Sequence, residues 1–479
     1  MWRGVFLCSA FLLAACSQPP SEPEAPERPN IIFLLVDDMG YADVAAYGNA
    51  YHQTPNIDLL AAAGMRFTDA YAAAPNCSPT RGSILTGRWP ARTGVTQYLP
   101  GNVLPYAKLL QAELPLGLPL DQAVIAEPLK AAGYATASIG KWHLGGGDFA
   151  PENRGFDVSF AGGHWNAHKS MFAPHPFVEI PGAKDGDYLT DRLTREAIEF
   201  IDANRENPFF LYLPYYAIHT PIQAKQALID GYEGREDPTG RNNAVYAAMT
   251  EGVDQSVGAL VAKLDELGLS ENTMIVFFSD NGGVPSLAFN GGLRSGKGYL
   301  WEGGVREPLI IKWPAMVEAG AVERRPVQSI DFYPTLLEAA QASDSEGHAT
   351  DGESLMPLLR GESETWTRDT LYWHYPHYAN AGSTPTGAIR QGDWKLIEFF
   401  EDNHVELYNL AEDPAETTDL ASEMPDKAAA LQQQLAQWRQ SVNAKPALPN
   451  PDYDPARADE RKGYAYHSVW NPADPIRND

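Results

Sequence analysis

The feature that most constrains the fold is a set of four short apolar runs, each followed closely by polar residues. The runs are rich in Ile, Val and Phe, and they are IIFLLV (31–36), ATASIG (135–140), PFFLYLPYYAI (208–218) and MIVFFS (274–279). Strands that are apolar without alternation are buried on both faces, which is typical of parallel sheets covered by helices. The runs therefore predict a buried, mostly parallel sheet.

Helical patterns separate these runs. Apolar residues recur three and four positions apart in 54–67, 187–204 and 242–268, and Gly64 closes the first of these helices. The segment 121–133 also has a helical pattern, but Pro128 should kink that helix or move its start along the chain. Strands that alternate with helices predict an α/β fold, in which a large, mostly parallel (mixed) sheet is sandwiched by helices.

The pattern changes from about residue 366. Alternating, aromatic-rich segments at 370–376, 387–400 and 404–410 are separated by turn residues, and a helical pattern follows at 425–442. We therefore expect a smaller C-terminal antiparallel sheet plus helix. The predicted units are a catalytic α/β domain at 30–365, an α+β domain at 366–445 and an extension at 446–479 that lies over the surface.

The N-terminus has the layout of a signal peptide at 1–15, with Arg3 followed by a short apolar run. LAAC, ending at Cys16, resembles a bacterial lipobox, so Cys16 is predicted to become the lipidated first residue. The alternative is an ordinary signal peptide with a chance cysteine. Residues 16–29 are rich in Pro and Glu and predict an unfolded tether. These features predict an exported lipoprotein that is held by lipid at Cys16, on the periplasmic face of the outer membrane or at the cell surface.

The net charge limits the possible binding partners, and the number of cysteines limits the possible disulfides. A formal net charge of −26 argues against a nucleic acid partner. Cys77 is the only cysteine beyond residue 16, so it cannot form an internal disulfide. It is therefore either a small buried hydrophobe or a residue with a chemical role.

The polar residues after the four apolar runs point to one site. They are Asp37 and Asp38 after the first run, Lys141 and His143 after the second, His219 after the third, and Asp280 and Asn281 after the fourth. Each alone has an ordinary explanation as a cap, a turn residue or a solvated side chain. However, ligands of parallel α/β sheets bind beyond the carboxyl ends of the strands, where these residues would meet.

The side chains of this set indicate a site that binds both a cation and an anion. Four oxygen-bearing side chains, Asp37, Asp38, Asp280 and Asn281, favour a hard divalent cation such as calcium or magnesium. The segment after Cys77 predicts a helix with Ser78 as its cap, and the start of a helix favours anions. Arg81, one turn along, can point to the same place. The sequence thus predicts a site for a small tetrahedral oxyanion.

Five blocks of the chain resemble a known family. CSPTRGSILTG (77–87) and GYATASIGKWHLG (133–145) resemble the two signatures of the formylglycine-dependent (type I) sulfatases of the alkaline phosphatase superfamily. The segments around 34–48, 54–72 and 280–310 are similar to further family blocks, in the family's order. The resemblance is strong over about 30–335, and GDWKLI with ELYNLAEDPAE extends it more loosely into the smaller domain.

The resemblance implies a modified residue and one calcium ion. A maturation enzyme would oxidise Cys77 to formylglycine, whose hydrate is the nucleophile and forms a covalent sulfo-enzyme intermediate. The calcium ligands would be Asp37, Asp38, Asp280, Asn281 and residue 77.

The resemblance also implies roles for the remaining side chains. Arg81, Lys141 and Lys297 would hold the sulfate oxygens. His219 would protonate the leaving alkoxide, Asp280 would take the proton of the nucleophile, and His143 would deprotonate the second hydroxyl so that sulfate leaves.

The predicted substrate is a sulfated polysaccharide or oligosaccharide. Candidate sugar-facing residues are His164, Trp165, His168, Lys169, His374 and His377, and the alternative is that they only pack loops. Two other functions stay open at this point. One is a formylglycine-dependent phosphonate or phosphate ester hydrolase, and the other is a catalytically dead lipoprotein that binds polyanions.

Overall fold

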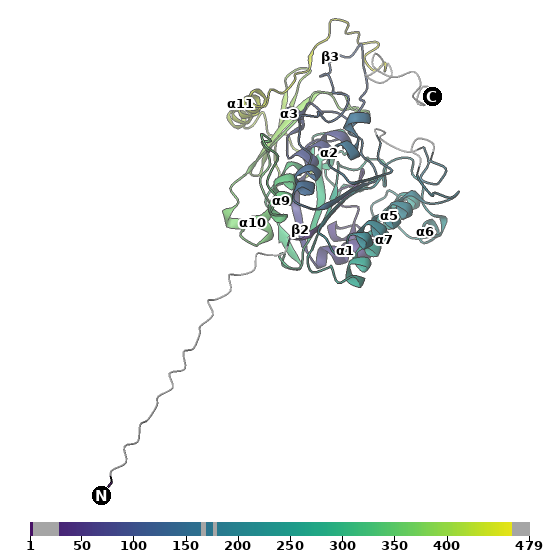
Figure 1. Ribbon diagram of the computed structural model, residues 1–479. Coiled ribbons are helices and arrows are strands. Elements are labelled where there is room, and N and C mark those ends of the chain that lie inside the picture. The colour runs from purple at the N-terminus through teal and green to yellow at the C-terminus, as the bar shows by residue number, and fades with distance from the viewer. Residues whose placement is uncertain (3–27, 164–168, 176–179, 462–479) are drawn as a thin grey trace.

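A mixed sheet of nine strands forms the centre of the protein (Figure 1). The computed structural model describes residues 1–2, 28–163, 169–175 and 180–461. The strand order is β10-β2-β8-β7-β1-β6-β4-β5, with β9 beside β2. The strands are β1 (Asn30–Val36), β2 (Met65–Tyr71), β4 (Ala135–Ile139), β5 (Val158–Phe160), β6 (Phe209–Pro214), β7 (Thr273–Ser279), β8 (Arg306–Lys312), β9 (Ala321–Glu323) and β10 (Val327–Gln328).

The strand directions confirm the predicted mostly parallel sheet. Only β8 runs antiparallel to its neighbours, β7 and β2, among the described strand pairs of this sheet. The other pairs are parallel, including those that β1 makes with β6 and β7.

Helices cover both faces of the sheet, as the unbroken apolar runs predict. Ile32, Leu34 and Val36 of β1 pack on one side, and the alternate residues of the same strand pack on the other. The first side is covered by α1 (Pro55–Ala62), α5 (Leu189–Ala203), α6 (Gln226–Asp230) and α7 (Ala244–Glu266). The second is covered by α2 (Cys77–Thr86), α4 (Ala126–Ala131), α9 (Phe332–Ala339) and α10 (Met356–Leu359).

Two predicted elements differ in length from the structure. The helix predicted at 121–133 starts only at Ala126, so that Pro128 lies in its first turn, where a proline is tolerated. The run 208–218 is a strand only to Pro214. Beyond it the backbone still bonds beside β1, because the Tyr215 amide donates to the Leu35 carbonyl at 2.8 Å.

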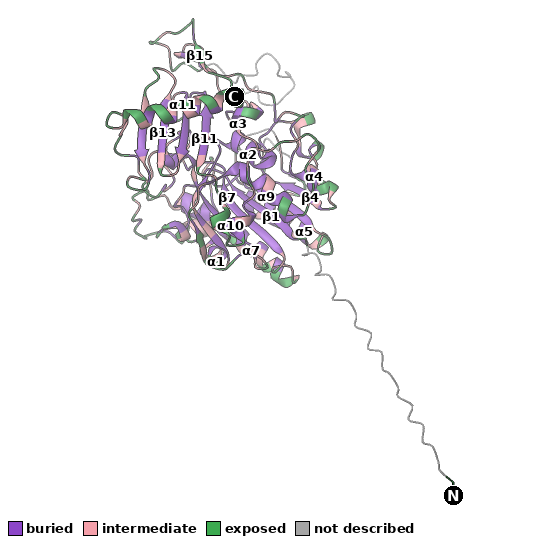
Figure 2. Ribbon diagram, turned by 90° about the vertical axis from the view of Figure 1, so that its left-hand side faces the viewer, coloured by how far each residue is buried: buried purple, intermediate pink, exposed green. Residues whose placement is uncertain are grey.

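A four-stranded antiparallel sheet with one long helix forms the C-terminal part, as predicted. Its strands are β11 (Thr370–Tyr375), β12 (Thr386–Gln391), β13 (Trp394–Phe399) and β14 (Val405–Asn409). One face packs on α11 (Pro425–Ser441), whose outer side is exposed (Figure 2). The other face packs on Tyr71, Leu300 and Val305, so the small sheet is joined to the large domain by a shared apolar core.

Short elements complete the fold. The extension returns to the large domain, where β15 (Leu448–Pro449) pairs with β3 (Leu109–Leu110). The remaining helical turns are α3 (Pro90–Thr93), α8 (Glu302–Val305), η1 (Ala45–Tyr47), η2 (Gly147–Phe149), η3 (Pro151–Asn153), η4 (Ser329–Asp331) and η5 (Ser363–Thr365). Within the described ranges, no helix is long and apolar enough to cross a membrane.

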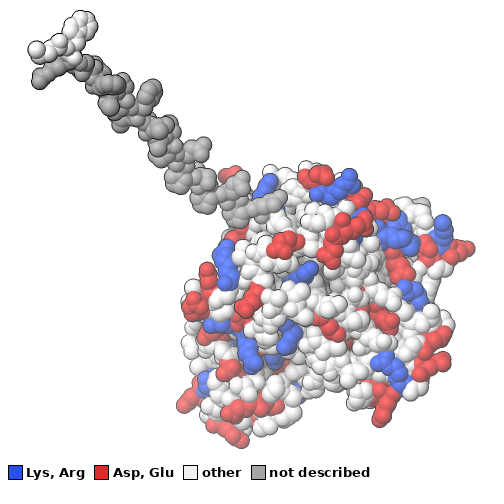
Figure 3. All heavy atoms as spheres, turned by 90° about the horizontal axis from the view of Figure 1, so that it is seen from below, with Lys and Arg blue, Asp and Glu red and all other residues white. Residues whose placement is uncertain are grey.

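Several predictions fall outside the described residues. They include the signal peptide, Cys16 and most of the tether, together with His164, Trp165, His168 and the end of the extension. On the face seen in Figure 3, the described acidic and basic side chains are interspersed rather than gathered into a broad basic patch.

Candidate active site

Four neighbouring strands bring the predicted site residues together. The order β7-β1-β6-β4 places the four polar strand ends side by side. The register pairs Val36 with Ser279, so Asp37 and Asp280 follow their strands at the same level. His219 lies further from its strand than predicted, and it is reached by a segment that bonds to Asp37: the Ile218 amide donates to the Asp37 carbonyl at 2.8 Å.

Three carboxylates and one thiol form the centre of the site. Ligand atoms of Asp37, Asp38, Cys77 and Asp280 all lie within 4.8 Å of one another. All four residues are buried. Burial and the neighbouring Asp37 raise the pKa of Asp280 to about 6, because crowded buried carboxylates resist ionisation.

Each carboxylate of this cluster is paired with one of the predicted cations. The ion pairs bring opposite charges into a water-poor environment, where they offset the cost of burying either partner alone. The pairs are Lys141 Nζ with Asp37 Oδ2 at 2.5 Å, Lys297 Nζ with Asp38 Oδ1 at 2.6 Å, and Arg81 Nη2 with Asp280 Oδ2 at 2.7 Å.

Cys77 is the first residue of α2, and its cap differs from the predicted one. Asn76 is the N-cap residue, and Ser78 lies inside the first turn. The Ser78 hydroxyl instead donates to the His143 carbonyl at 2.7 Å. The Cys77 Sγ lies 3.6 Å from Asp37 Oδ1 and 3.5 Å from Lys297 Nζ. Burial raises the pKa of this thiol to about 12 despite the nearby lysines, so the thiol stays protonated.

His143 is a buried imidazole with one unused nitrogen. Its Nε2 lies 2.6 Å from the Leu99 carbonyl, which can only accept, so Nε2 carries the hydrogen. Nδ1 is then a bare acceptor, and it is buried without a hydrogen-bond partner. Burial and the positive charge of Lys141 hold the pKa of His143 well below its usual value. The neutral ring is therefore arranged to accept a proton at Nδ1.

His219 lies at the edge of the cluster. Its Nδ1 lies 2.8 Å from the Thr220 carbonyl, and its Nε2 lies 3.7 Å from Asp38 Oδ2. Burial and Lys297 lower the pKa of His219 to about 3, so Nε2 carries no proton in this state. Approach of an anion beside the ring would favour the protonated form.

The donor set fits a hard divalent cation. Asn281 Nδ2 donates to Asp38 Oδ1 at 2.8 Å, while Asn281 Oδ1 is buried without a partner. An orphaned buried oxygen beside three carboxylates is a natural ligand for calcium or magnesium, which prefer oxygen donors.

Backbone geometry at the site is unusual at two residues. Asp38 and His143 have φ values of 64° and 59°, in the left-handed region that non-glycine residues rarely adopt. Such conformations persist where the surrounding structure holds them, often at functional sites.

A hydrogen-bond triangle behind Cys77 could not be predicted from the sequence. Asn76 Nδ2 donates to Tyr375 Oη at 2.7 Å and to Gln97 Oε1 at 3.0 Å, and the Tyr375 hydroxyl donates to the same Gln97 oxygen at 2.7 Å. Tyr375 belongs to β11, so the small sheet supports the start of the helix that carries Cys77. Its spacing from Asn76 in the sequence gives no signal of this contact.

Two of the predicted sugar-facing residues are wrong. His374 is 6% exposed and lies 2.8 Å from the Lys445 carbonyl, and His377 is 1% exposed and lies 2.8 Å from Thr96 Oγ1. Both are packing residues: His374 lies on the face of the small sheet that packs on α11 and the segment after it, and His377 contacts the large domain. Lys169 is exposed.

Gly140 fixes the position of Lys141, and Gly140→Ala is expected to destabilise the protein strongly. A Cβ at this position would lie 2.0 Å from the Pro214 carbonyl oxygen, and φ is 127°. The clash with backbone should cost about 3 kcal/mol or more of unfolding free energy. Urea unfolding measures the loss.

Gly133→Ala is the matched control for this prediction. Gly133 precedes the same strand with φ of 90°, but a Cβ there meets nothing within 4 Å. Gly133→Ala should lose only the unfolding free energy that an alanine costs at a positive φ, about 1–2 kcal/mol. Equal losses in the two variants would contradict the predicted clash.

Comparison with known proteins agrees with this arrangement. The Sulfatase family model matches residues 29–342, and a model described as N-sulphoglucosamine sulphohydrolase, C-terminal, matches residues 295–443. A sulfatase of Formosa agariphila is 33% identical, with 90% of this chain and 92% of that protein aligned.

Two further relatives are named with a substrate or a bound sugar. N-acetylgalactosamine-6-sulfatase of Mus musculus is 35% identical over 71% of this chain and 68% of that protein. The crystal structure of Ps i-CgsB in complex with k-i-k-neocarrahexaose is 31% identical, with a TM-score of 0.75 over 89% of this chain and 95% of that one. The chain belongs to the sulfatase family of the alkaline phosphatase superfamily and is a sulfuric ester hydrolase.

Proposed function

We propose that this protein removes sulfate from a sulfated polysaccharide or oligosaccharide, with residue 77 working as formylglycine. The observation that carries the proposal is the place of Cys77, buried at the start of α2 with its Sγ 3.5 Å from Lys297 Nζ. A relative solved in complex with k-i-k-neocarrahexaose and an N-acetylgalactosamine-6-sulfatase among the homologues support a carbohydrate substrate.

The modification is consistent with the surroundings of Cys77. It is the free cysteine of the described chain, so within the described residues no disulfide occupies the sulfur that a maturation enzyme would oxidise. Formylglycine would supply a hydrated aldehyde, one hydroxyl for attack on sulfur and a second whose deprotonation releases sulfate.

Lys297 and His219 would meet the substrate first. Their side chains are 19% and 14% exposed, whereas those of Lys141 and Arg81 are fully buried. An ester entering from solvent therefore meets Lys297, which balances the charge of the sulfate. Lys141 and Arg81 lie deeper in the site than Lys297, where they hold Asp37 and Asp280 in place.

The two histidines suit opposite proton transfers. His143 has a buried bare Nδ1, which can take a proton from a hydroxyl at residue 77. His219 has its Nε2 at the exposed edge, where the protonated ring could donate to the leaving alkoxide.

Calcium is the proposed cofactor. Asp37, Asp38, Asp280 and Asn281, together with residue 77, would hold it. When bound, it would stabilise negative charge on the oxygens that surround it.

A substrate panel tests the proposed function. Wild-type protein, matured together with a formylglycine-generating enzyme, is assayed on defined sulfated oligosaccharides, an aryl sulfate, a phosphate monoester and a phosphonate monoester. We expect the highest kcat/KM on a sulfated oligosaccharide. Faster turnover of the phosphate or phosphonate ester would refute the proposal, as would turnover of the aryl sulfate with none of the sugars.

We further propose that Cys16 carries a lipid anchor in an outer membrane. The LAAC sequence and the Pro/Glu-rich tether support this placement. Cys16→Ser should release the protein into the soluble fraction, because an acyl chain contributes about 0.8 kcal/mol per buried methylene. Fractionation with an antibody measures the release, and wild-type protein found wholly in the soluble fraction would contradict the anchor.

A further inference from the structure

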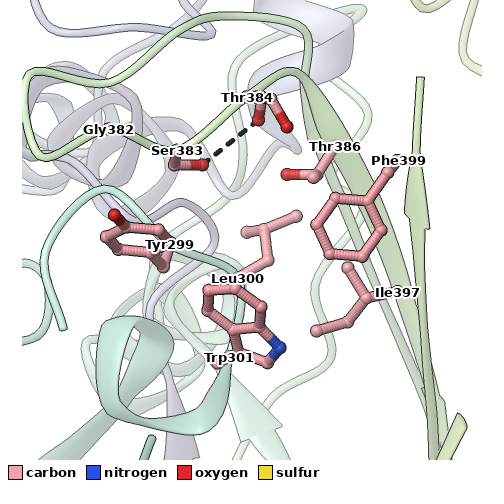
Figure 4. Close-up of a pocket in the computed structure, with 9 residues that line it drawn as sticks. All are labelled: Tyr299, Leu300, Trp301, Gly382, Ser383, Thr384, Thr386, Ile397 and Phe399. Atoms are coloured by element: carbon pink, nitrogen blue, oxygen red, sulfur yellow. Dashed lines mark hydrogen bonds between the residues drawn. The ribbon is translucent and has the colours of Figure 1, made fainter. Parts of the chain in front are cut away.

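A pocket lies between the loop after Lys297 and the small sheet (Figure 4). Its volume is about 200 Å³, and its walls include Tyr299, Trp301, Ser383, Thr386 and Phe399. Tyr299 follows Lys297 by two residues, so their Cα atoms are at most about 7 Å apart. The Gly298 amide between them donates to the Pro75 carbonyl at 2.8 Å, which joins this wall to the loop before Cys77.

The aromatic walls of the pocket are fixed by contacts with one another and with neighbours outside it. Tyr299 and Trp301 are stacked with ring centroids 5.2 Å apart, and the Arg294 guanidinium covers the Trp301 ring at 3.9 Å. His404 stacks on Phe399 with centroids 4.2 Å apart. The rings therefore need little ordering when a ligand binds, which favours affinity.

A buried hydroxyl in the pocket has no partner. Thr386 is 3% exposed, and its Oγ1 makes no hydrogen bond. The hydroxyl points into the space between Ser383, Tyr299 and Phe399 (Figure 4). Because buried polar atoms are normally satisfied, this oxygen indicates a ligand that can donate or accept a hydrogen bond.

We propose that this pocket binds an uncharged sugar unit of the substrate, next to the unit whose sulfate is removed. Aromatic faces together with hydroxyls suit a pyranose ring, which has apolar faces and hydroxyl edges. None of the nine described residues that line the pocket is charged, so a sulfate there would be desolvated without a counter-charge. The inference rests on the proposed carbohydrate substrate, and it makes the enzyme selective for a neighbouring unit without sulfate.

Two pocket variants test the proposal on two kinds of substrate. Phe399→Ala removes one wall, and Thr386→Val removes the hydroxyl at nearly constant shape. We expect each to lower kcat/KM on a monosulfated trisaccharide by about 3- to 10-fold, mainly through KM, since aromatic contacts and hydrogen bonds have this size. The rate on 4-nitrophenyl sulfate, which has no sugar, should change less than about twofold on the same scale.

Phe400→Ala is the matched control, because Phe400 is the next residue but does not line the pocket. It should leave the ratio of the two activities unchanged. A second sulfate on the neighbouring sugar should lower kcat/KM of the wild type. Equal losses on both substrates in the pocket variants, or no loss on the trisaccharide, would overturn the inference.

A binding measurement separates this inference from the proposed function. Saturation-transfer NMR with an unsulfated trisaccharide needs no turnover. We expect a signal in the wild type and in Phe400→Ala that is weakened in Phe399→Ala. An unchanged signal in Phe399→Ala would overturn the pocket proposal, whereas failure to cleave any sulfated sugar would overturn the proposed substrate.

Discussion

Cys77→Ala is expected to abolish sulfatase activity while leaving the fold intact. Removing a nucleophile costs at least about 10⁴-fold in kcat. The side chain is small and 2% exposed, so the loss of its sulfur should cost only about 1 kcal/mol of unfolding free energy. Activity is measured on an aryl sulfate, and stability by thermal unfolding.

Cys77→Ser distinguishes the proposed formylglycine from a simple nucleophile. A serine hydroxyl can attack sulfur, but it has no second hydroxyl whose deprotonation could expel the sulfate. We therefore expect this variant to gain the mass of one SO₃ group on the peptide that carries residue 77 and not to turn over. Peptide mass spectrometry of the active wild type should show an aldehyde at 77 that reacts with hydrazines. Full activity in a preparation whose residue 77 is an intact thiol would contradict the proposed formylglycine.

The sequence predicted which strand ends carry the site because that inference depends on local patterns. Apolar runs without alternation indicate buried parallel strands, and the polar residues that follow them lie at one edge of the sheet. Asp37, Lys141 and Asp280 could be placed in this way. The order of the strands could not, because β1 pairs with β6 and β7, which lie far along the chain. The antiparallel direction of β8 also depends on connections that a pattern does not reveal.

Contacts between distant residues account for what the sequence did not reveal. The carbonyl of Leu99 fixes the hydrogen of His143, yet a backbone carbonyl has no sequence signature. Another example joins the small sheet to the large domain, where Lys395 Nζ of β13 is fully buried and lies 2.8 Å from Oε1 of Glu302 in α8. The same Nζ lies 3.0 Å from Glu416 Oε1. A lysine in an alternating strand would be placed on the solvent face, but here the large domain covers that face.

Two predictions were wrong because serine and histidine each have more than one common structural role. Ser78 was expected to cap α2, since serine is common at that position, but Asn76 occupies it and Ser78 bonds to the His143 carbonyl. His374 was expected to face a sugar, since histidine and aromatic residues together suit carbohydrate. The aromatic pocket that the structure does contain is lined instead by Tyr299 and Trp301, which belong to a family block, and by Phe399.

Removal of calcium is expected to abolish activity and lower the melting temperature. Without the cation, Asp37, Asp38 and Asp280 are still paired with Lys141, Lys297 and Arg81, so the fold should persist at lower stability. A ligand present at 1,000 times its Kd stabilises the native state by about 4 kcal/mol, so chelation should remove about that much. Added calcium should restore both properties, and elemental analysis should find one ion per chain.

A comparison of Asn281→Ala with Asp43→Asn distinguishes the loss of a calcium ligand from the loss of a buried polar group elsewhere in the core. Asn281 Oδ1 is the orphaned oxygen of the site, so its loss should raise the calcium concentration needed for half-maximal stabilisation at least about tenfold. Asp43 is equally buried, but its carboxylate is satisfied by the Gly40 and Phe289 amides and the Tyr246 hydroxyl. Asp43→Asn should therefore lower the melting temperature without shifting the calcium titration. Activity that survives exhaustive chelation, with no metal found in the protein, would exclude calcium as a cofactor.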